Sequence, residues 1–546
     1  MRVAEALAGA LLELGIDTAF GLVGSGNFHL TGALVRGGGR FVAARHEGAA
    51  ITMADAYTRV SGRPCACTVH QGPGMTNLMT GLTEAAKART PLLVLAADSP
   101  AAALRSNFRI DQAGLAAAVG ALHERAGSPE SALADLARAH RRARLERRPV
   151  VVSLPIDVQE SPAPDLPLPG PAPPPAPLRP PAEAVARAAD LLVAARRPLV
   201  LAGRGAVLAG AGEGLARLAE AAGALLATSA MANGLFAGQD FALGVAGGFA
   251  APFAAELIRD ADLVLAFGAT LNMWTTRHGR LLGPAVRVVQ VDVEAGAIGA
   301  HARADLGLVA DAGEAAEALC RELERRGHRP DTWRTPELAR RIRERSWAGQ
   351  PFADASDGER IDPRTLSIAL DRLLPRERLV AVDSGHFMGW PVMYWQVPDE
   401  CGFVFTQAFQ SVGLGLASAV GAAVARPDRL VVAALGDGGA LMAASELETV
   451  VRLGLPLLIV VYDDAAYGAE VHHFGPDPGP LDIVRFPDAD LAALARGAGA
   501  EGVIVRRVED LEAVEGWLSE RRRPLLVDAK VVPTVVAEWL SEAFGH

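Results

Sequence analysis

The feature that most constrains the fold of this 546-residue chain is a series of short apolar runs that recurs along its whole length. Each run is apolar almost without interruption, carries glycine or an acidic residue at or near its end, and is followed by a longer stretch. Uninterrupted apolarity is typical of parallel strands that helices cover on both faces. The runs are CACTVHQG (65–72), PLLVLAAD (91–98), RPLVLAGRG (197–205), DLVLAFGA (262–269), VRVVQVDV (286–293), LVAVDSG (379–385), LVVAALGDG (430–438) and PLLIVVYDD (456–464). The pattern predicts an α/β fold of doubly wound parallel sheets, which bind ligands at the carboxyl ends of their strands.

Two breaks in composition divide these runs into three groups. The first is the segment 161–182, SPAPDLPLPGPAPPPAPLRPPA, whose prolines can neither pair in a sheet nor continue a helix. The second is softer and extends from 327 to 360, where polar and charged residues predominate. We therefore predict linkers at both places and three α/β domains at 1–160, 183–326 and 361–546. The chain is also too long for a single hydrophobic core.

Charge and hydropathy exclude several kinds of partner. The formal net charge is −10 and no basic cluster is interleaved with aromatic residues, so we expect no nucleic-acid binding. No run approaches the roughly 20 apolar residues that a membrane span needs. Because Glu5 and Glu13 interrupt the apolar stretch 1–14, it predicts an amphipathic first helix and not a signal peptide. These features favour a cytoplasmic protein that acts on small molecules.

Cysteine and lysine are both scarce. The cysteines have neither the number nor the spacing of a disulfide framework or a zinc site, which predicts free thiols in a reducing compartment. They are Cys65, Cys67, Cys320 and Cys401. Lys87 and Lys530 are the only lysines, so few residues are available for Schiff-base chemistry and a pyridoxal enzyme is disfavoured.

Acidic residues follow two successive strands of the third predicted domain. The sequence GDGG (436–439) follows one apolar run and leads into a helix, and the next strand, 457–461, is followed by Asp463 and Asp464. Glycines allow main-chain amides to approach a phosphate, but carboxylates repel a phosphate unless a hard cation lies between them. The pair Asp437 and Asp464 therefore predicts a Mg²⁺ site that bridges the protein to a diphosphate. The alternative is that Asp437 is an acidic N-cap and that Asp463 and Asp464 form a turn exposed to solvent.

The spacing of these residues resembles a known motif. A Gly-Asp-Gly, then 24 residues (439–462), then a pair of Asn or Asp residues resembles the diphosphate motif of thiamine diphosphate enzymes. The resemblance implies that Asp437, Asp464 and the main-chain carbonyl of Ala466 bind magnesium. The pair Asp463-Asp464 departs from the usual Asn-Asn or Asn-Asp, so it adds negative charge beside the diphosphate.

Two further segments of the third domain extend the resemblance. In TQAFQSVGLGLASAVGAA (406–423), Val412 has the place of the apolar residue that props the cofactor into a bent conformation. In VDSGHFMGW (382–390), the residues after the strand correspond to positions near the diphosphate, although His386 by itself is equally compatible with a structural role. The implied cofactor-binding residues of this domain are Gly385, His386, Phe387, Gln410, Val412, Gly436, Asp437, Gly438, Gly439, Asp464, Ala466, Tyr467 and Gly468.

The first domain supplies a candidate base. Glu47 follows a short predicted strand, 41–44, at the start of a helix of small residues. The resemblance assigns this glutamate to ring N1′ of the aminopyrimidine, where a carboxyl group favours the imino tautomer that removes the thiazolium C2 proton. Apolar surroundings would raise the pKa of Glu47 and suit proton sharing. The alternative is an ordinary acidic residue in the first turn of a helix.

The segment 70–98, HQGPGMTNLMTGLTEAAKARTPLLVLAAD, resembles the pyrimidine-binding domain over its whole length. The loop FGLVGSGNFHL (20–30) resembles the family's Phe-Gly-x-Pro-Gly loop, with Val23 in place of proline. His29 and His70 together suggest a proton-handling pocket, although a lone histidine in such a loop is more often structural. The catalytic candidates are Glu47, His70, Gln71, Asn27 and His29, and the cofactor-binding candidates of this domain are Glu47, Gly24, Pro73 and Asn77.

The middle domain resembles the central domain of the same family. In some members this domain carries FAD, in others an ADP-like nucleotide, and in many no ligand. The residues that would line a nucleotide site are Gly203, Gly205, Gly268 and Asp292, but these glycines also suit plain strand-to-helix turns.

The resemblance covers nearly the whole chain and is strongest to the large catalytic subunit of the acetolactate synthase-like branch. It implies that a 2-oxo acid is decarboxylated and that the resulting enamine is carboligated to a second carbonyl compound. It also implies a homodimer or homotetramer in which Glu47 of one subunit meets Asp437 and Asp464 of another. The alternatives are a non-ligating 2-oxo acid decarboxylase or a carbon–carbon lyase of the same family. From other classes, an FAD-dependent oxidoreductase or a non-catalytic relative remains open.

Overall fold

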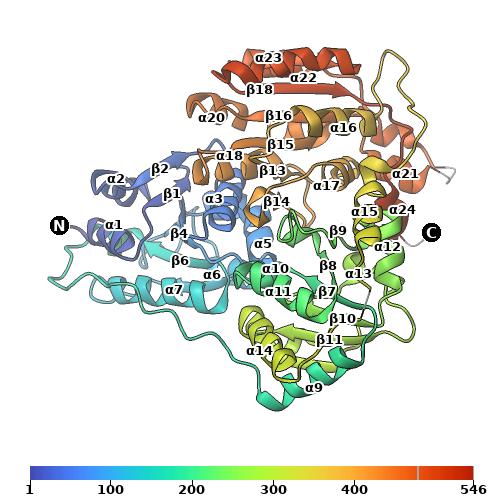
Figure 1. The fold of residues 1–546 in the computed structure, drawn as a ribbon. Helices are drawn as coiled ribbons and strands as arrows, with labels where there is room; N and C mark the ends of the chain where they lie inside the picture. Colours follow the sequence, from blue (N-terminus) through green and yellow to red (C-terminus); the bar gives the residue numbers. More distant parts are fainter. Residues whose placement is uncertain (332, 476–478, 545–546) are drawn as a thin grey trace.

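The computed structural model describes residues 1–331, 333–475 and 479–544. They form three sheets of six strands each, and every strand pair within the sheets is parallel. Figure 1 shows the three α/β layers in chain order, the first in blue and cyan, the second in green and yellow, and the third in orange and red. The predicted fold of three doubly wound parallel sheets is therefore confirmed. No helix among the described residues has the length and hydropathy that crossing a membrane requires.

The first sheet has the strand order β2-β1-β3-β4-β6-β5. Its central strands are buried along their whole length, as uninterrupted apolar runs predict. The strands are β1 Thr18–Gly21, β2 Arg40–Ala43, β3 Ala66–Val69, β4 Leu93–Asp98, β5 Leu122–Arg125 and β6 Val150–Pro155. The helices are α1 Val3–Glu13, α2 Phe28–Arg36, α3 Glu47–Ser61, α4 Pro73–Asn77, α5 Met79–Lys87, α6 Gln112–Ala118, α7 Ala132–Glu146 and α8 Ile156–Glu160.

The second sheet has the order β12-β11-β10-β7-β8-β9. Its parallel strands are added outward in one direction from β7 and in the other direction from β10, so the strand order switches between these two neighbours. Its strands are β7 Pro198–Ala202, β8 Leu225–Thr228, β9 Ala242–Val245, β10 Leu263–Phe267, β11 Arg287–Asp292 and β12 Leu306–Val309. Its helices are α9 Ala182–Ala194, α10 Arg204–Leu208, α11 Gly212–Ala222, α12 Pro252–Arg259, α13 Met273–Thr276 and α14 Ala312–Arg325. Between α8 and α9, the proline-rich segment runs along the outside of the molecule (Figure 1).

The third sheet has the order β14-β13-β15-β16-β18-β17. Its strands are β13 Arg378–Val382, β14 Phe403–Phe405, β15 Leu430–Gly436, β16 Leu458–Asp463, β17 Glu501–Val505 and β18 Leu525–Lys530. Its helices are α16 Pro363–Leu373, α17 Gly389–Tyr394, α18 Gly415–Ala425, α19 Asp437–Met442, α20 Glu446–Arg452, α21 Gly468–Phe474, α22 Leu491–Gly497, α23 Glu512–Glu520 and α24 Glu538–Phe544.

The second predicted linker, 327–360, contains a helix that composition alone did not indicate. Helix α15, Pro336–Glu344, begins after Thr335, whose side chain accepts a hydrogen bond from the main-chain N–H of Leu338. Leu338 is buried, and the guanidinium of Arg341 stacks on the ring of Phe253 in α12. A Thr-Pro-Glu sequence is a helix-start signal, but the many charged residues of this segment obscured it.

The first and third domains share one hydrophobic core. Helices α3 and α18 lie against each other, and almost every residue of α18 is buried. A Cβ atom at Gly421 of α18 would stand 2.1 Å from the main-chain oxygen of Met53 in α3. Glycine is therefore required at this crossing, because it lets the two helix backbones touch.

We expect Gly421→Ala to destabilise the protein by about 1–3 kcal/mol, because the added methyl group must push two packed helices apart. The thermal unfolding midpoint of the variant measures the effect. Gly516→Ala is the matched control, because Gly516 lies within α23 with open space around it. That control should raise stability by about 0.4–1 kcal/mol. Equal midpoints for the two variants would contradict a close contact between α3 and α18.

Candidate active site

Two aspartates meet at one edge of the third sheet. Strands β15 and β16 are parallel neighbours with Gly436 opposite Tyr462, so Asp437 and Asp464 follow at the same edge. Burial, and then the charge of Asp464, raises the pKa of Asp437 to about 8. Burial also raises the pKa of Asp464 to about 7. Asp437 is buried and Asp464 is half-buried, and two such carboxylates that repel each other are stable as anions only when a cation lies beside them.

The oxygen atoms at this edge fit Mg²⁺. Oδ1 of Asp464 accepts a hydrogen bond of 3.2 Å from the main-chain N–H of Ala466, which holds Ala466 next to that carboxylate. Among the described residues, no main-chain hydrogen bond uses the carbonyl oxygen of Ala466. A cavity of about 340 Å³, lined by Asp437, Tyr467 and Phe486, opens beside these groups. Proteins hold Mg²⁺ through one or two carboxylates together with phosphate oxygens and water.

Glycines bring the main chain into contact with two carboxylates of the third domain, those of Asp464 and of Asp383 at the end of β13. A Cβ at Gly468 would stand 2.3 Å from Oδ2 of Asp464, and a Cβ at Gly439 would stand 2.4 Å from Oδ2 of Asp383. No larger residue fits at either position while these side chains stay in place. The structure brings the following predicted residues together around Asp437 and Asp464: Gly385, His386, Phe387, Gly436, Gly438, Gly439, Tyr467 and Gly468.

Asp383 lies beside the candidate site and was not among the residues predicted from the sequence. It follows β13, is completely buried, and accepts hydrogen bonds from the main-chain N–H groups of Ser384, Gly413 and Leu414 at 2.8 to 3.1 Å. Burial raises the pKa of Asp383 to about 6. Its carboxylate fixes the loop that carries Val412. The signal that could have identified it is the one that identified Asp437, an acidic residue at the end of an apolar strand.

The loop with Gln410 and Val412 is also held from the first domain. Glu84 of α5 is buried and accepts hydrogen bonds from the main-chain N–H groups of Ala408 and Phe409 at 3.3 and 2.7 Å. Arg59 of α3 pairs with Glu84 at 2.8 Å and donates to the main-chain oxygen of Phe405 at 3.0 Å. The backbone of Gln410 has a φ of +64°, and Val412 is 36% exposed at the surface of the site.

His386 is held by the C-terminal segment. Its Nε2 atom accepts a hydrogen bond of 2.8 Å from the main-chain N–H of Ala537, and its carbonyl oxygen accepts one of 3.1 Å from the indole of Trp539. Burial lowers the pKa of His386 to about 3, so the ring is neutral. A ring nitrogen that is already engaged favours the structural interpretation of this histidine.

Glu47 is the first residue of α3. The side-chain amide of Asn77 donates a hydrogen bond of 3.0 Å to Oε2 of Glu47, so one carboxyl oxygen is oriented by a neighbour. His46 precedes the helix, and its Nδ1 atom accepts from the main-chain N–H of Gly48. Within one chain Glu47 is half-buried, which is less enclosed than the apolar surroundings that the sequence predicted.

Gly24 lies against the ring of His70, where a Cβ at Gly24 would stand 2.8 Å from the imidazole. Nδ1 of His70 accepts a hydrogen bond of 3.3 Å from the main-chain N–H of Gly26, and the ring contacts Phe108 edge-on at 5.2 Å. Burial lowers the pKa of His70, and the charge of Glu47 opposes that shift, so the two residues interact electrostatically.

The two residues that follow His70 have distinct roles. The side-chain oxygen of Gln71 is buried without a hydrogen-bond partner among the described residues. Gly72, at a φ of +68°, then turns the chain so that Pro73 can begin α4.

Asn27 and His29 do not reach a common pocket with His70. The Asn27 side chain is buried, accepts from the main-chain N–H of Gly24 at 2.8 Å, and donates to the hydroxyl of Thr68 at 3.0 Å. It therefore shapes the loop around Gly24. His29 is exposed, and its Nε2 atom lies 3.0 Å from the guanidinium of Arg2. No contact between described side chains joins His29 to His70, because α2 turns His29 toward the N-terminus.

Within the described part of one chain, Glu47 is not bonded to the two aspartates of the third domain. Among the described residues, no hydrogen bond or ion pair links Glu47 to Asp437 or Asp464. The segment before Glu47 instead contacts α20, where Glu446 accepts from the main-chain N–H groups of Arg45 and His46 at 3.0 Å. Large apolar side chains are exposed beside both halves. They are Val23 and Phe108 in the first domain and Leu441, Met442 and Tyr467 in the third.

The four residues proposed to line a nucleotide site in the central domain lie at the ends of β7, β10 and β11. The main-chain N–H of Gly205 donates to the oxygen of Gly268 at 3.0 Å, and a Cβ at Gly205 would stand 2.6 Å from Cα of Gly268. A Cβ at Gly203 would stand 2.3 Å from the same oxygen, and Asp292 accepts from the main-chain N–H of Glu294. These close contacts are those of plain strand-to-helix turns, so a flavin or nucleotide in this domain stays a prediction.

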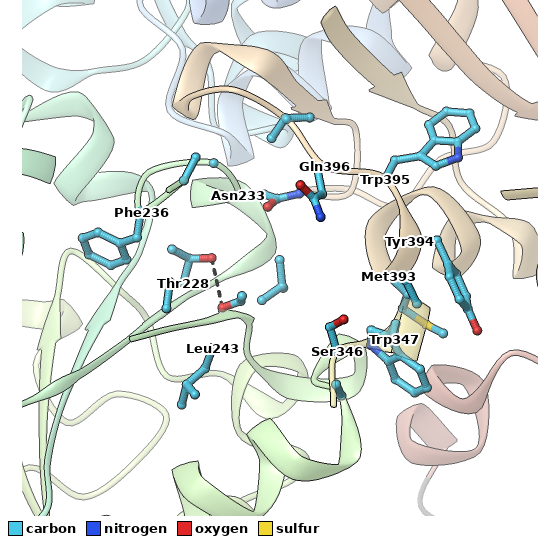
Figure 2. A pocket seen from close by; sticks show the side chains of 18 of the residues that line it. Thr228, Asn233, Phe236, Leu243, Ser346, Trp347, Met393, Tyr394, Trp395 and Gln396 are labelled. Carbon is cyan, nitrogen blue, oxygen red and sulfur yellow. Dashed lines mark hydrogen bonds between the residues drawn. The ribbon is translucent and has the colours of Figure 1, made fainter. Parts of the chain in front are cut away.

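A second cavity, of about 990 Å³, lies between the central and third domains. Figure 2 shows Thr228, Phe236 and Leu243 on one side of it and Trp347, Tyr394 and Gln396 among the residues on the other. None of the residues predicted to bind cofactor or metal lines this cavity. We therefore place the candidate site at the strand ends of the first and third sheets.

Three family models match the chain in order. They are described as the N-terminal TPP binding domain, the central domain and the C-terminal TPP binding domain of thiamine pyrophosphate enzymes. They match residues 1–124, 185–319 and 383–529.

Curated relatives cover almost the whole chain. The sulfoacetaldehyde acetyltransferase of Rhodobacter capsulatus is 30% identical over 99% of this chain and 94% of the relative. A putative acetolactate synthase large subunit of Mycobacterium tuberculosis is 29% identical over 98% of each chain. A probable 2-ketoarginine decarboxylase of Pseudomonas aeruginosa is 32% identical over 94% of this chain and 91% of the relative.

A solved structure has the same fold. The thiamine diphosphate-dependent 4-hydroxybenzoylformate decarboxylase of Rhodococcus jostii superposes with a TM-score of 0.82 at 24% identity. The match covers 97% of this chain and 99% of that chain.

Proposed function

The chain belongs to the thiamine pyrophosphate enzyme family, and from that premise we propose that it uses thiamine diphosphate and Mg²⁺ to decarboxylate a 2-oxo acid and to join the product to a second carbonyl compound. The observation that carries the proposal is the pair of carboxylates at adjacent strand ends, the buried Asp437 and the half-buried Asp464, which repel each other. Two relatives, named an acetyltransferase and an acetolactate synthase, support the carboligation. The relative named a decarboxylase supports simple decarboxylation as the second candidate.

The residues of the third domain would hold the charged end of the cofactor. Asp437, Asp464 and the carbonyl of Ala466 would bind Mg²⁺, and the glycines around them allow the main chain to approach a diphosphate. Asp383 fixes the loop of Val412, whose exposed side chain faces the space where the cofactor would bend. When bound, thiamine diphosphate supplies a carbon nucleophile and takes up the electron pair that carbon dioxide leaves behind.

The residues of the first domain would control protons. Asn77 orients one carboxyl oxygen of Glu47, and the other is free to hold a proton at ring N1′ of the cofactor. His70 lies within electrostatic range of Glu47 and is kept neutral by burial, so it is suited to bind the substrate without repelling a cationic ring.

We propose a homodimer as the smallest active assembly, with the possibility of a tetramer built from two dimers. Among the described residues, no hydrogen bond or ion pair joins Glu47 to Asp437 or Asp464 within one chain, and exposed apolar side chains lie in both domains. Surfaces of this kind are typical of sites that another subunit covers. Glu47 of one subunit would then face Asp437 and Asp464 of its partner.

The test uses the purified protein with thiamine diphosphate, Mg²⁺ and a panel of 2-oxo acids, each with and without an aldehyde or a second 2-oxo acid. We expect release of carbon dioxide and a product whose mass contains both carbon fragments. An aldehyde as the only product would support the simple decarboxylase. Absence of cofactor binding would contradict the proposal and favour a non-catalytic relative, and flavin absorbance with redox turnover would favour an oxidoreductase.

A further inference from the structure

Asp463, the neighbour of the proposed metal ligand Asp464, is bound by a lysine of the adjacent strand. Asp463 is the last residue of β16, lines the cavity beside Asp437, and is opposite Lys530 of β18 in the sheet. Its carboxylate is 2.6 Å from the ammonium of Lys530, the residue opposite it in the sheet. Both side chains are 2% exposed. The negative charge that Asp463 adds in place of the usual asparagine therefore has a cationic partner, Lys530, within the protein.

Lys530 is saturated with oxygen partners. Besides Asp463, its Nζ atom lies 2.6 Å from Asp488, 2.6 Å from the main-chain oxygen of Ala489 and 3.0 Å from the buried Asp528. A compact ammonium can serve several oxygens that converge on one point, whereas the planar guanidinium of arginine cannot. The chain otherwise uses arginine almost exclusively, since only Lys87 and Lys530 are lysines.

The same carboxylate also shapes the metal-binding loop. Oδ1 of Asp463 accepts a hydrogen bond of 3.0 Å from the main-chain N–H of Ala465, whose φ of +55° is unusual for alanine. Ala465 lies between Asp464 and Ala466, which supply the side chain and the carbonyl proposed for the metal. One oxygen of Asp463 is thus tied to Lys530, and the other sets the backbone of the loop.

We propose that Lys530 is a positioning residue for the metal site, acting through Asp463 on the loop that carries Asp464 and Ala466. The inference rests on the proposed function, because it concerns how this chain prepares the same site. It explains how aspartate can replace the asparagine that usually precedes the ligand. An aspartate at position 463 would need a lysine at position 530 to shape the metal-binding loop. An asparagine at position 463 would carry no charge and would not need that lysine.

The test compares Lys530→Met with Asp463→Asn/Lys530→Met. In the single variant Asp463 loses its partner and leaves Ala465, so Mg²⁺ binding in the presence of thiamine diphosphate should weaken about tenfold to hundredfold. In the double variant an asparagine oxygen still accepts from Ala465, and residue 463 carries no charge, so Mg²⁺ binding should return to within about threefold of the wild type. Asp488 and Asp528 lose the ammonium equally in both variants, so they do not contribute to the difference between them. Isothermal titration with Mg²⁺ measures both.

Arg378→Met is the matched control for lost stability. Arg378 is at the start of β13 in the same domain, is equally buried, and pairs with Asp371 away from the metal loop. It should lower the thermal midpoint without changing Mg²⁺ affinity. Removing the positive charge of Lys530 would by itself attract Mg²⁺ more strongly, so unchanged or tighter binding by Lys530→Met would overturn the proposal.

Two further outcomes keep the proposal separate from the proposed function. If Lys530→Met does not fold, Mg²⁺ titration of the double variant tests the proposal instead. A folded double variant that has lost Mg²⁺ binding would overturn the positioning role. Failure of the wild-type protein to bind Mg²⁺ with thiamine diphosphate would instead contradict the proposed function. The thermal midpoint of the metal-free protein should be lower in the single variant than in the double variant, which tests the pair of charges without any cofactor.

Discussion

Glu47→Gln is expected to slow exchange of the C2 proton of bound thiamine diphosphate by about 10²- to 10⁴-fold, the range typical of a lost general acid or base. Binding of the cofactor should stay within about threefold of the wild type. The two side chains have the same shape, and the hydrogen bond from Asn77 to Oε2 can be kept by the glutamine oxygen. What is lost is the carboxyl oxygen that would share a proton with ring N1′.

The measurement is hydrogen–deuterium exchange at C2 in the complex, followed by acid quenching and NMR of the released cofactor. Glu448→Gln is the matched control. Glu448 pairs with Arg45, two residues before Glu47, but it belongs to α20 and has no assigned role in catalysis. Its exchange rate should equal that of the wild type. An undiminished rate in Glu47→Gln would mean that another group activates the cofactor.

Asp437→Asn should abolish the Mg²⁺-dependent stabilisation that thiamine diphosphate gives to the wild-type protein. A ligand at 100 times its Kd stabilises a protein by about 2.7 kcal/mol, and a hundredfold weaker affinity leaves about 0.4 kcal/mol. The metal-free variant should be at least as stable as the wild type, because the substitution removes a buried charge that repels Asp464. The variant should thus lose the stabilisation by Mg²⁺ and thiamine diphosphate without losing stability in the metal-free state. A variant that was merely damaged would be less stable in both states.

Thermal unfolding with and without Mg²⁺ and thiamine diphosphate measures both quantities. Asp428→Asn is the control, because Asp428 is an exposed residue of the same domain that pairs only with nearby arginines. It should leave the Mg²⁺-dependent shift unchanged. A full shift in Asp437→Asn would place the metal at a different pair of residues.

Several predictions from the sequence depended only on residues that are close together in the chain. The apolar runs became parallel strands, and their order along the chain divided them among three sheets. Asp437 and Asp464 each follow a strand directly, so their place at one sheet edge was determined once β15 and β16 were neighbours.

Other features depended on partners that are distant in the sequence. Asn27 has the residue type of a catalytic group, but its contacts with Gly24 and Thr68 make it a support of the loop. His29 contacts Arg2, and Asp383 binds the backbone of a loop that begins about 30 residues later. The contact between Gly205 and Gly268 joins two turns that are more than 60 positions apart in the sequence.

The sequence by itself determined the class of fold, the strand ends that carry acidic residues and the turns between strands and helices, because these follow from spacing within a few residues. Only the tertiary structure decided which partner each polar side chain has. Lys530 reaches Asp463 across 67 positions of sequence, and Glu84 reaches Phe409 across 325. Such pairs form because the packing of whole layers brings two surfaces together, and the periodicity of a single segment carries no information about the surface that it will meet.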